Sequence, residues 1–369
     1  MRDAGTRASD TVAPAGPDRE GDPWITTDRL VLRRPRMDDL RDYLRLHGDP
    51  RTYAHSPASQ PSPERCRERL ADDLADWERE GLGYVAVVDR ATDEVIGWAG
   101  LRHKDSDPES LNLYYRLLHD RLGQGLGRAI SRAVVAWATE HRPDALVTAM
   151  VDTVNAASLR TATSSGLVQV GMRRLKDRPD GEPMAYFEAP RVASVPTGAP
   201  DRSLRAAIAD LWVRANDAGG SVGFLPGAPR GDVEAALDRH VEDVTRGRSL
   251  LCLLRDPGGD LRGLGFWEHS RGFPHEHVAG LKRLMVGPES QGRNLGRLLL
   301  GGMVGIVRRE LPWVELLRLD YRDGLGLGEF YARSGWTEVG RVPGGLRLSA
   351  TDYRDDVAMA RRVDGEPLR

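Results

Sequence analysis

The segment Leu122-Gly-Gln-Gly-Leu-Gly-Arg128 recurs in altered form as Gln291-Gly-Arg-Asn-Leu-Gly-Arg297, 169 residues further along the chain. The register persists beyond the two segments. Gly125 is followed 41 residues later by Gly166 of Ser165-Gly-Leu167, and Asn294 is followed 41 residues later by Gly335 of Ser334-Gly-Trp336. Self-similarity kept over such a distance predicts a duplicated domain.

The length of the chain agrees with two domains. It has 369 residues, of which 40% are hydrophobic, so each half has enough apolar side chains for a core of its own. We expect one domain over 24–190, a second over 204–363, and a linker over 191–203, where Pro, Gly and small polar residues gather. Residues 1–23 have almost no large apolar side chain, which predicts a disordered tail.

Charge and composition exclude several classes of function. The net charge of −2, with both signs interspersed, argues against a nucleic-acid binder. Cys66 and Cys252 are isolated and lack the spacing of metal ligands, which fits a reducing compartment. The N-terminus has no apolar core typical of a signal sequence, and no run is long enough to span a membrane. We therefore expect a cytoplasmic protein that binds neither membranes nor metal.

Hydrophobic periodicity and turn residues predict an α/β fold with a similar order of elements in both halves. In the first half we expect strands at 29–34, 84–89, 95–101, 111–117 and 146–151, and helices beginning at 38 and over 63–80, 129–141 and 156–165. In the second half we expect strands at 250–255, 263–268, 282–286 and 316–321, and helices over 232–246, 296–310 and 328–334.

Each glycine-rich segment lies between a predicted strand and a predicted helix. Such a turn leaves several backbone N–H groups free to bind one anion, and the helix dipole adds positive potential there. The turn suits a pyrophosphate, although glycines at such a junction also serve close packing. Neither segment contains Gly-Lys-Ser/Thr, as a P-loop does, and Gly123-x-Gly125-x-Gly127 lacks the spacing of a dinucleotide fold.

Both halves resemble the GNAT superfamily of acetyl-CoA-dependent N-acetyltransferases, whose pyrophosphate loop reads Gln/Arg-x-x-Gly-x-Gly/Ala. The second half matches from Gln291 to Gly296, with Asn294 where the family has glycine. The first half is similar to the branch that resembles ribosomal-protein N-terminal acetyltransferases, with Leu122 where that branch often has an aromatic residue. The resemblance implies tandem domains, each a mixed, splayed sheet flanked by helices. It also implies acetyl transfer from acetyl-CoA to a primary amine of a small molecule or a protein N-terminus.

The resemblance places acetyl-CoA along the glycine loop and the strand before it. In the second half it implies contacts from Leu284, Val286, Gln291, Gly292, Arg293, Asn294, Leu295, Gly296 and Arg297. In the first half it implies contacts from Leu117, Gly123, Gln124, Gly125, Leu126, Gly127, Arg128 and Asn155. Asn155 is equally typical of a helix N-cap. Arg128 and Arg297 are suited to phosphate contacts, with solvated helix positions as the alternative.

A later helix of the family commonly reads Asn-x-x-small-x-x-x-Tyr-x-x-x-Gly. The first half keeps Asn155 and Ser158 without the tyrosine, and the second keeps Tyr331 without the asparagine. By resemblance Tyr331 is the general acid that protonates the departing CoA thiolate, with packing beside Phe330 as the alternative. Ser158 fills a similar role in the first half, or caps and packs its helix.

A base must remove a proton from the ammonium of the acceptor before attack. Glu268, His269, His275, Glu276 and His277 cluster before the strand at 282–286, and of these we select His275 and His277, because histidine titrates near neutral pH. A polar surface loop is the alternative. In the first half, Asn112 stands where related branches often carry Glu. The candidates for the base there are therefore His103, Glu109 or a water molecule.

The second half retains both the Gln-led loop and the phenol, so we expect it to be the more competent half. One alternative is a first half that has become a structural or regulatory CoA-binding module. The other is a scaffold without enzymatic activity.

Overall fold

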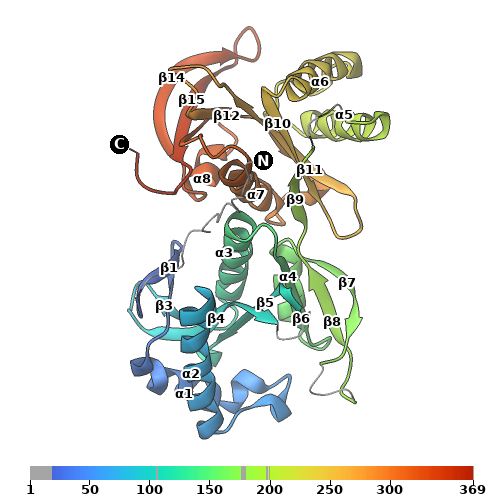
Figure 1. Cartoon of the computed structure of the whole chain (residues 1–369). Helices are drawn as coiled ribbons and strands as arrows, with labels where there is room; N and C mark the ends of the chain where they lie inside the picture. Colours follow the sequence, from blue (N-terminus) through green and yellow to red (C-terminus); the bar gives the residue numbers. More distant parts are fainter. Residues whose placement is uncertain (1–18, 105–106, 176–179, 197, 199, 369) are drawn as a thin grey trace, which may run out of the picture.

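The computed structural model describes residues 19–104, 107–175, 180–196, 198 and 200–368, so most of the predicted tail lies outside the described residues. The described chain forms two mixed sheets, each flanked by helices (Figure 1). This α/β architecture is the predicted fold class. In the described part of the chain, no helix is both long and apolar enough to span a membrane.

The first sheet has eight strands in the order β1-β2-β3-β4-β5-β6-β8-β7. Its strands are β1 (Pro23–Thr26), β2 (Leu30–Arg33), β3 (Tyr84–Asp89), β4 (Val95–Lys104), β5 (Asp107–Leu117), β6 (Leu146–Val151), β7 (Val168–Arg173) and β8 (Met184–Glu188). Helices α1 (Leu40–Gly48) and α2 (Pro63–Glu80) pack over Ala86 and Trp98. Helices α3 (Leu126–His141) and α4 (Ala156–Ser164) belong to the core on the opposite face, with Val85 and Val87.

The second sheet has seven strands in the order β14-β15-β13-β12-β11-β10-β9. Its strands are β9 (Arg191–Ser194), β10 (Ser249–Arg255), β11 (Leu261–His269), β12 (Val278–Val286), β13 (Leu316–Arg322), β14 (Thr337–Arg347) and β15 (Tyr353–Arg362). Helices α5 (Arg202–Asp217) and α6 (Arg230–Thr245) pack over Leu264 and Phe266, and α7 (Leu295–Glu310) and α8 (Leu327–Ala332) over Trp267. Short 3₁₀ turns are η1 (Met37–Asp39), η2 (Pro50–Tyr53), η3 (Pro57–Ser59), η4 (His119–Arg121) and η5 (Pro288–Ser290).

Each sheet contains one parallel pair of strands, at the same place in the strand order. Strands β5 and β6 pair through Ser110, Leu111 and Asn112 only. Strands β12 and β13 pair through Val278, Ala279 and Gly280 only. Over the rest of their described lengths the paired strands are not joined, so each sheet splays toward the loop that follows β5 or β12.

The segment predicted as a linker over 191–203 contains a strand and the start of a helix. Strand β9 pairs with β10, and a Cβ added at Gly302 of α7 would overlap Val192, so β9 is packed into the second domain. Asp201 then caps α5 by accepting a hydrogen bond from the Leu204 amide at 2.8 Å. The composition of 191–203 does not reveal β9, because Pro and small polar residues dominate it and the pairing of this strand depends on the distant β10.

The two domains are packed together through α3 and α7, which lie side by side at the centre of the molecule (Figure 1). Gly301 and Gly305 of α7 face α3, and a Cβ added at Gly305 would lie 2.6 Å from the Glu140 carbonyl oxygen. Glycines one turn apart therefore allow the two helix backbones to approach closely. A single hydrophobic core continues from one sheet to the other across this contact.

Candidate active site

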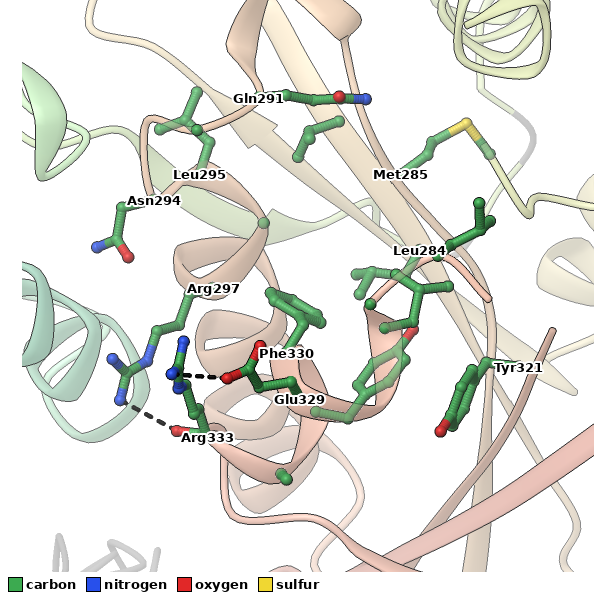
Figure 2. Close-up of a pocket in the computed structure, with 18 of the residues that line it drawn as sticks. Leu284, Met285, Gln291, Asn294, Leu295, Arg297, Tyr321, Glu329, Phe330 and Arg333 are labelled. Atoms are coloured by element: carbon green, nitrogen blue, oxygen red, sulfur yellow. Dashed lines mark hydrogen bonds and ion pairs between the residues drawn. The ribbon is translucent and has the colours of Figure 1, made fainter. Parts of the chain in front are cut away.

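A cavity of about 1400 Å³ opens where β12 and β13 separate (Figure 2). Its walls come from β12, the loop before α7, β13, α8 and the loop that follows α5. Pockets for drug-sized ligands measure roughly 300–1,000 Å³, so this cavity has room for a larger molecule. Apolar side chains such as Leu284 and Phe330 line its interior, and arginines stand at its edge.

The loop before α7 presents a row of backbone amides to the cavity. Gly292 and Asn294 adopt left-handed conformations, with φ of +75° and +69°. Gly123 and Gly125 adopt φ values of +75° and +74° at the corresponding positions of the first domain. Within the described chain, the amides of residues 292–296 have no hydrogen-bond acceptor. Together with the N-terminus of α7, they can bind an anionic group.

The conformation and contacts of Asn294 explain why this loop has asparagine where the loop of the first domain has Gly125. Asparagine tolerates the left-handed region better than most residues, so the loop keeps its shape. Its side-chain amide donates to the carbonyl oxygens of Arg132 at 3.1 Å and Ser165 at 3.2 Å, both in the first domain. In Figure 2 the side chain points away from Leu284 and Tyr321. The Asn294 side chain therefore joins the loop to the first domain by hydrogen bonds and does not cover the free backbone amides.

Tyr331 of α8 lines the cavity and is only 7% exposed. Its ring packs against Tyr321, with centroids 5.7 Å apart. Burial raises the pKa of Tyr331 and the nearby Tyr321 raises it further, so the phenol is protonated at neutral pH. No hydrogen-bond partner for its hydroxyl occurs among the described residues. The group is therefore a proton donor available to a ligand in the cavity.

The other end of the cavity holds a cluster that the sequence did not reveal. Arg283 sits where the pairing of β11 with β12 shifts, with φ of +56°, and lines the cavity. Its Nε lies 3.4 Å from Nε2 of His240, and Nδ1 of His240 lies 3.9 Å from Glu268. Burial, with Arg283 adding to it, lowers the pKa of His240 to about 4, so this ring is neutral at pH 7. Asp320 also lines the cavity, 3.8 Å from Lys282.

His275 and His277 do not line the cavity. Both belong to the loop before β12, at the end of the strand that still pairs with β13, whereas the cavity lining on β12 begins at Leu281. His275 is exposed, and the carbonyl oxygen of His277 accepts from the amides of Glu315 and Leu316. The prediction that one of these histidines is the base thus has no support in the geometry, because histidine chemistry alone does not fix which end of a strand faces the cavity.

Most of the predicted cofactor residues of the second half line this cavity. Arg293 does not, and is exposed; the cavity-lining members are Leu284, Val286, Gln291, Gly292, Asn294, Leu295, Gly296 and Arg297. Of the residues predicted for the first half, Gly125 and Arg128 line this same cavity. The remaining ones, Leu117, Gly123, Gln124, Leu126, Gly127 and Asn155, do not line it.

The corresponding region of the first domain is bridged by side chains. The hydroxyl of Tyr115 on β5 donates to Ser158 on α4 at 3.0 Å. The residues 169 positions later are Leu284 and Leu327, which line the cavity and form no such bridge. Asn155 accepts from the Ser158 amide at 3.0 Å and is the N-cap of α4.

The polar groups considered as bases in the first half lie on its central strands. The Asn112 side chain donates to the Tyr84 hydroxyl at 3.1 Å, while His103 lies on β4 and Glu109 on β5. Among the residues that the structure describes, no three His, Cys, Asp or Glu side chains are grouped so that they could hold a metal ion.

Residues 29–168, within the first half of the chain, match the family model of the acetyltransferase (GNAT) domain. Solved structures that match part of this chain include an acetyltransferase from Agrobacterium tumefaciens, with 24% identity, 44% of this chain and 92% of that chain covered, and a TM-score of 0.38. Another is spermidine N-acetyltransferase from Vibrio cholerae in complex with CoA and spermine, with 17% identity, 47% and 96% covered, and a TM-score of 0.39.

Proposed function

We propose that the protein is an acetyl-CoA-dependent N-acetyltransferase made of two tandem GNAT domains, with the C-terminal cavity as its main active site. The observation that carries the proposal is a single cavity lined by both Tyr331, with its buried phenol, and Gly292, Asn294, Leu295 and Gly296, whose backbone amides have no acceptor among the described residues. The family match in residues 29–168 supports acetyltransferase chemistry for the fold.

In this proposal the pyrophosphate of acetyl-CoA binds the amides before α7, where the helix dipole favours negative charge. The pantetheine arm then enters between β12 and β13, whose unpaired backbone groups can hydrogen bond to its amides. Leu284 and Phe330 pack on the arm from the sides. The thioester thereby reaches the depth at which Tyr331 lines the cavity.

The reaction requires the acceptor to lose a proton and attack the thioester carbonyl as a neutral amine. Asp320 is a carboxylate that lines the cavity, and it accepts this proton directly or through water. Attack forms the C–N bond. When the tetrahedral intermediate collapses, the C–S bond breaks, Tyr331 gives its proton to the departing thiolate, and the nitrogen loses its second proton to solvent. The products are CoA and an N-acetylated amine, and solvent restores the proton to the phenol.

A second candidate places catalysis in the N-terminal half. The family match covers that half, and Asn155 and Ser158 remain there. Against this reading stands the Tyr115–Ser158 hydrogen bond, which joins β5 to α4 beside the place where β5 and β6 separate. We therefore assign the N-terminal half a lesser or supporting role.

The test is release of CoA thiol from acetyl-CoA with a panel of primary amines that includes polyamines, amino acids and N-terminal peptides. Tyr331→Phe removes only the hydroxyl and is expected to lower kcat by about 10²-fold or more. Tyr353→Phe, at an exposed tyrosine that begins β15, is the matched control. Ser158→Ala tests the N-terminal half. Full turnover in Tyr331→Phe overturns the assignment, and a loss in Ser158→Ala alone would move catalysis to the first domain.

A further inference from the structure

The wall at the outer edge of the C-terminal cavity belongs to the N-terminal domain. Arg128 and Arg132 lie one turn apart on α3 and both line the cavity. Residues 26–28, at the end of β1 and in the turn to β2, line it as well, and so does Arg90, after β3. A ligand in this cavity is therefore bounded by both domains.

This wall carries an excess of positive charge. Arg128 and Arg132 approach Arg297 of α7 and Arg333 at the end of α8, and all four line the cavity (Figure 2 shows Arg297 and Arg333). Burial, with the nearby Arg128, lowers the pKa of Arg132, and burial, with Arg132 and Arg333, lowers that of Arg297. Burial is the larger cause of both shifts, and the neighbouring guanidinium groups add to it, so these cations lie close enough to repel one another.

The acidic groups at the same edge do not balance the charge. Asp28 and Glu329 both pair with Arg333, at 3.1 and 2.7 Å. Within the described chain, Arg128 is exposed and has no ion-pair partner. Arg132 makes only a long contact of 3.4 Å with the side-chain oxygen of Asn294. The cluster is thus suited to a ligand with a dianionic group.

The position of the four arginines in the cavity indicates which group of CoA would lie next to them. If the amides of residues 292–296 hold the pyrophosphate and the gap between β12 and β13 holds the pantetheine, the nucleotide must lie at the outer edge. The remaining phosphate of CoA is on the ribose of that nucleotide. Arg128 lies on α3, which forms this outer edge of the cavity.

We propose that Arg128 and Arg132 of the N-terminal domain bind the 3′-phosphate of the CoA held in the C-terminal cavity. The inference rests on the proposed function of that cavity. It gives the N-terminal domain a role in the activity of its partner domain, since it supplies part of the cofactor site. A C-terminal domain without these arginines would bind CoA through an incomplete site.

The test is calorimetric titration of the full chain with CoA and with 3′-dephospho-CoA. Arg128→Ala is the main variant, because its side chain has no described structural contact. Arg67→Ala, on the exposed face of α2, removes the same charge elsewhere. Leu284→Trp places an indole in the proposed path of the pantetheine arm, so the double variant Leu284→Trp/Arg128→Ala reports whether Arg128 acts in this cavity or in the first domain.

We expect Arg128→Ala to weaken CoA binding by about 10-fold or more, the usual scale for a lost charge-assisted contact. Binding of 3′-dephospho-CoA is expected to be the same in wild type, Arg128→Ala and Arg67→Ala. Equal losses for both ligands, or a loss that persists in the Leu284→Trp background, would overturn the inference while leaving the proposed function intact. Absence of CoA binding to the wild-type protein would overturn both.

Discussion

Glu140 holds the two domains together, and its removal is the sharpest test of the interface. It lies in the last turn of α3 and contacts two arginines of the second domain: Arg308 at 2.7 Å and Arg361, whose Nη1 lies 3.2 Å from Oε2 of Glu140. The three side chains are 12%, 18% and 10% exposed. Burial opposes ionisation, but Arg361, His141 and Arg308 outweigh it, and the pKa of Glu140 lies below its usual 4.5.

Removing one partner of a buried ion pair costs about 3–5 kcal/mol, because the other charge is left uncompensated. Some solvent reaches these side chains, so we expect Glu140→Ala to lower the free energy of unfolding by about 3 kcal/mol, at the lower end of that range. Because the pKa of Glu140 is lowered in the folded protein, the contribution is present above about pH 4.5 and disappears as pH falls through the folded pKa.

Urea unfolding measured by tryptophan fluorescence at pH 7 and at several lower pH values checks this prediction. Glu68→Ala is the control, since Glu68 pairs with Arg65 at 2.7 Å on the surface and both side chains are more than half exposed. We expect no resolvable change from that variant. If Glu140→Ala is as stable as Glu68→Ala, or if its destabilisation is the same at every pH, the ion cluster does not join the domains as described.

Three further changes test other parts of the structure. Gly305→Ala is expected to destabilise the protein by about 1–3 kcal/mol, because the added Cβ would meet the Glu140 carbonyl oxygen. The control Gly231→Ala, in open space on α6, is expected to stabilise it by about 0.4–1 kcal/mol. Thermal melts in which Gly305→Ala is the more stable variant contradict the packing of α7 on α3. Asn294→Gly keeps the left-handed loop but loses two hydrogen bonds to the first domain, so urea unfolding should show a loss of about 1–3 kcal/mol while CoA affinity is retained. Burial raises the pKa of Asp73 to about 7, so the stability of the wild type relative to Asp73→Asn is expected to fall as pH rises from 4 to 7. A difference in stability between the two proteins that stays constant over this range refutes the shift.

Elements with strong local signals could be predicted from the sequence. Helix α2 spans the predicted 63–80 because Ser62 caps its first turn, Pro63 occupies the first position, and Gly81 ends it in a left-handed conformation. These signals depend only on neighbouring residues. The glycine loops were found for the same reason, and their φ values agree at positions 169 residues apart.

Features that depend on distant packing could not be predicted. Strand β9 has only four residues, and its place in the sheet depends on β10, more than fifty residues away. The Tyr115–Ser158 hydrogen bond joins two elements, and nothing in the sequence near either residue indicates the other. The contribution of Arg128 to the second domain's cavity depends on how α3 packs on α7. The failure to place His275 and His277 has the same origin, because the splay decides which end of β12 is accessible.

The central claim is that the C-terminal cavity holds acetyl-CoA. Calorimetric titration of CoA into the wild type and Leu284→Trp tests it most directly, because the indole would occupy the cavity where β12 and β13 separate. We predict that Leu284→Trp keeps the wild-type melting temperature to within a few degrees, about what one kcal/mol produces, and loses one CoA site. Identical stoichiometry and affinity in the two proteins would contradict the claim.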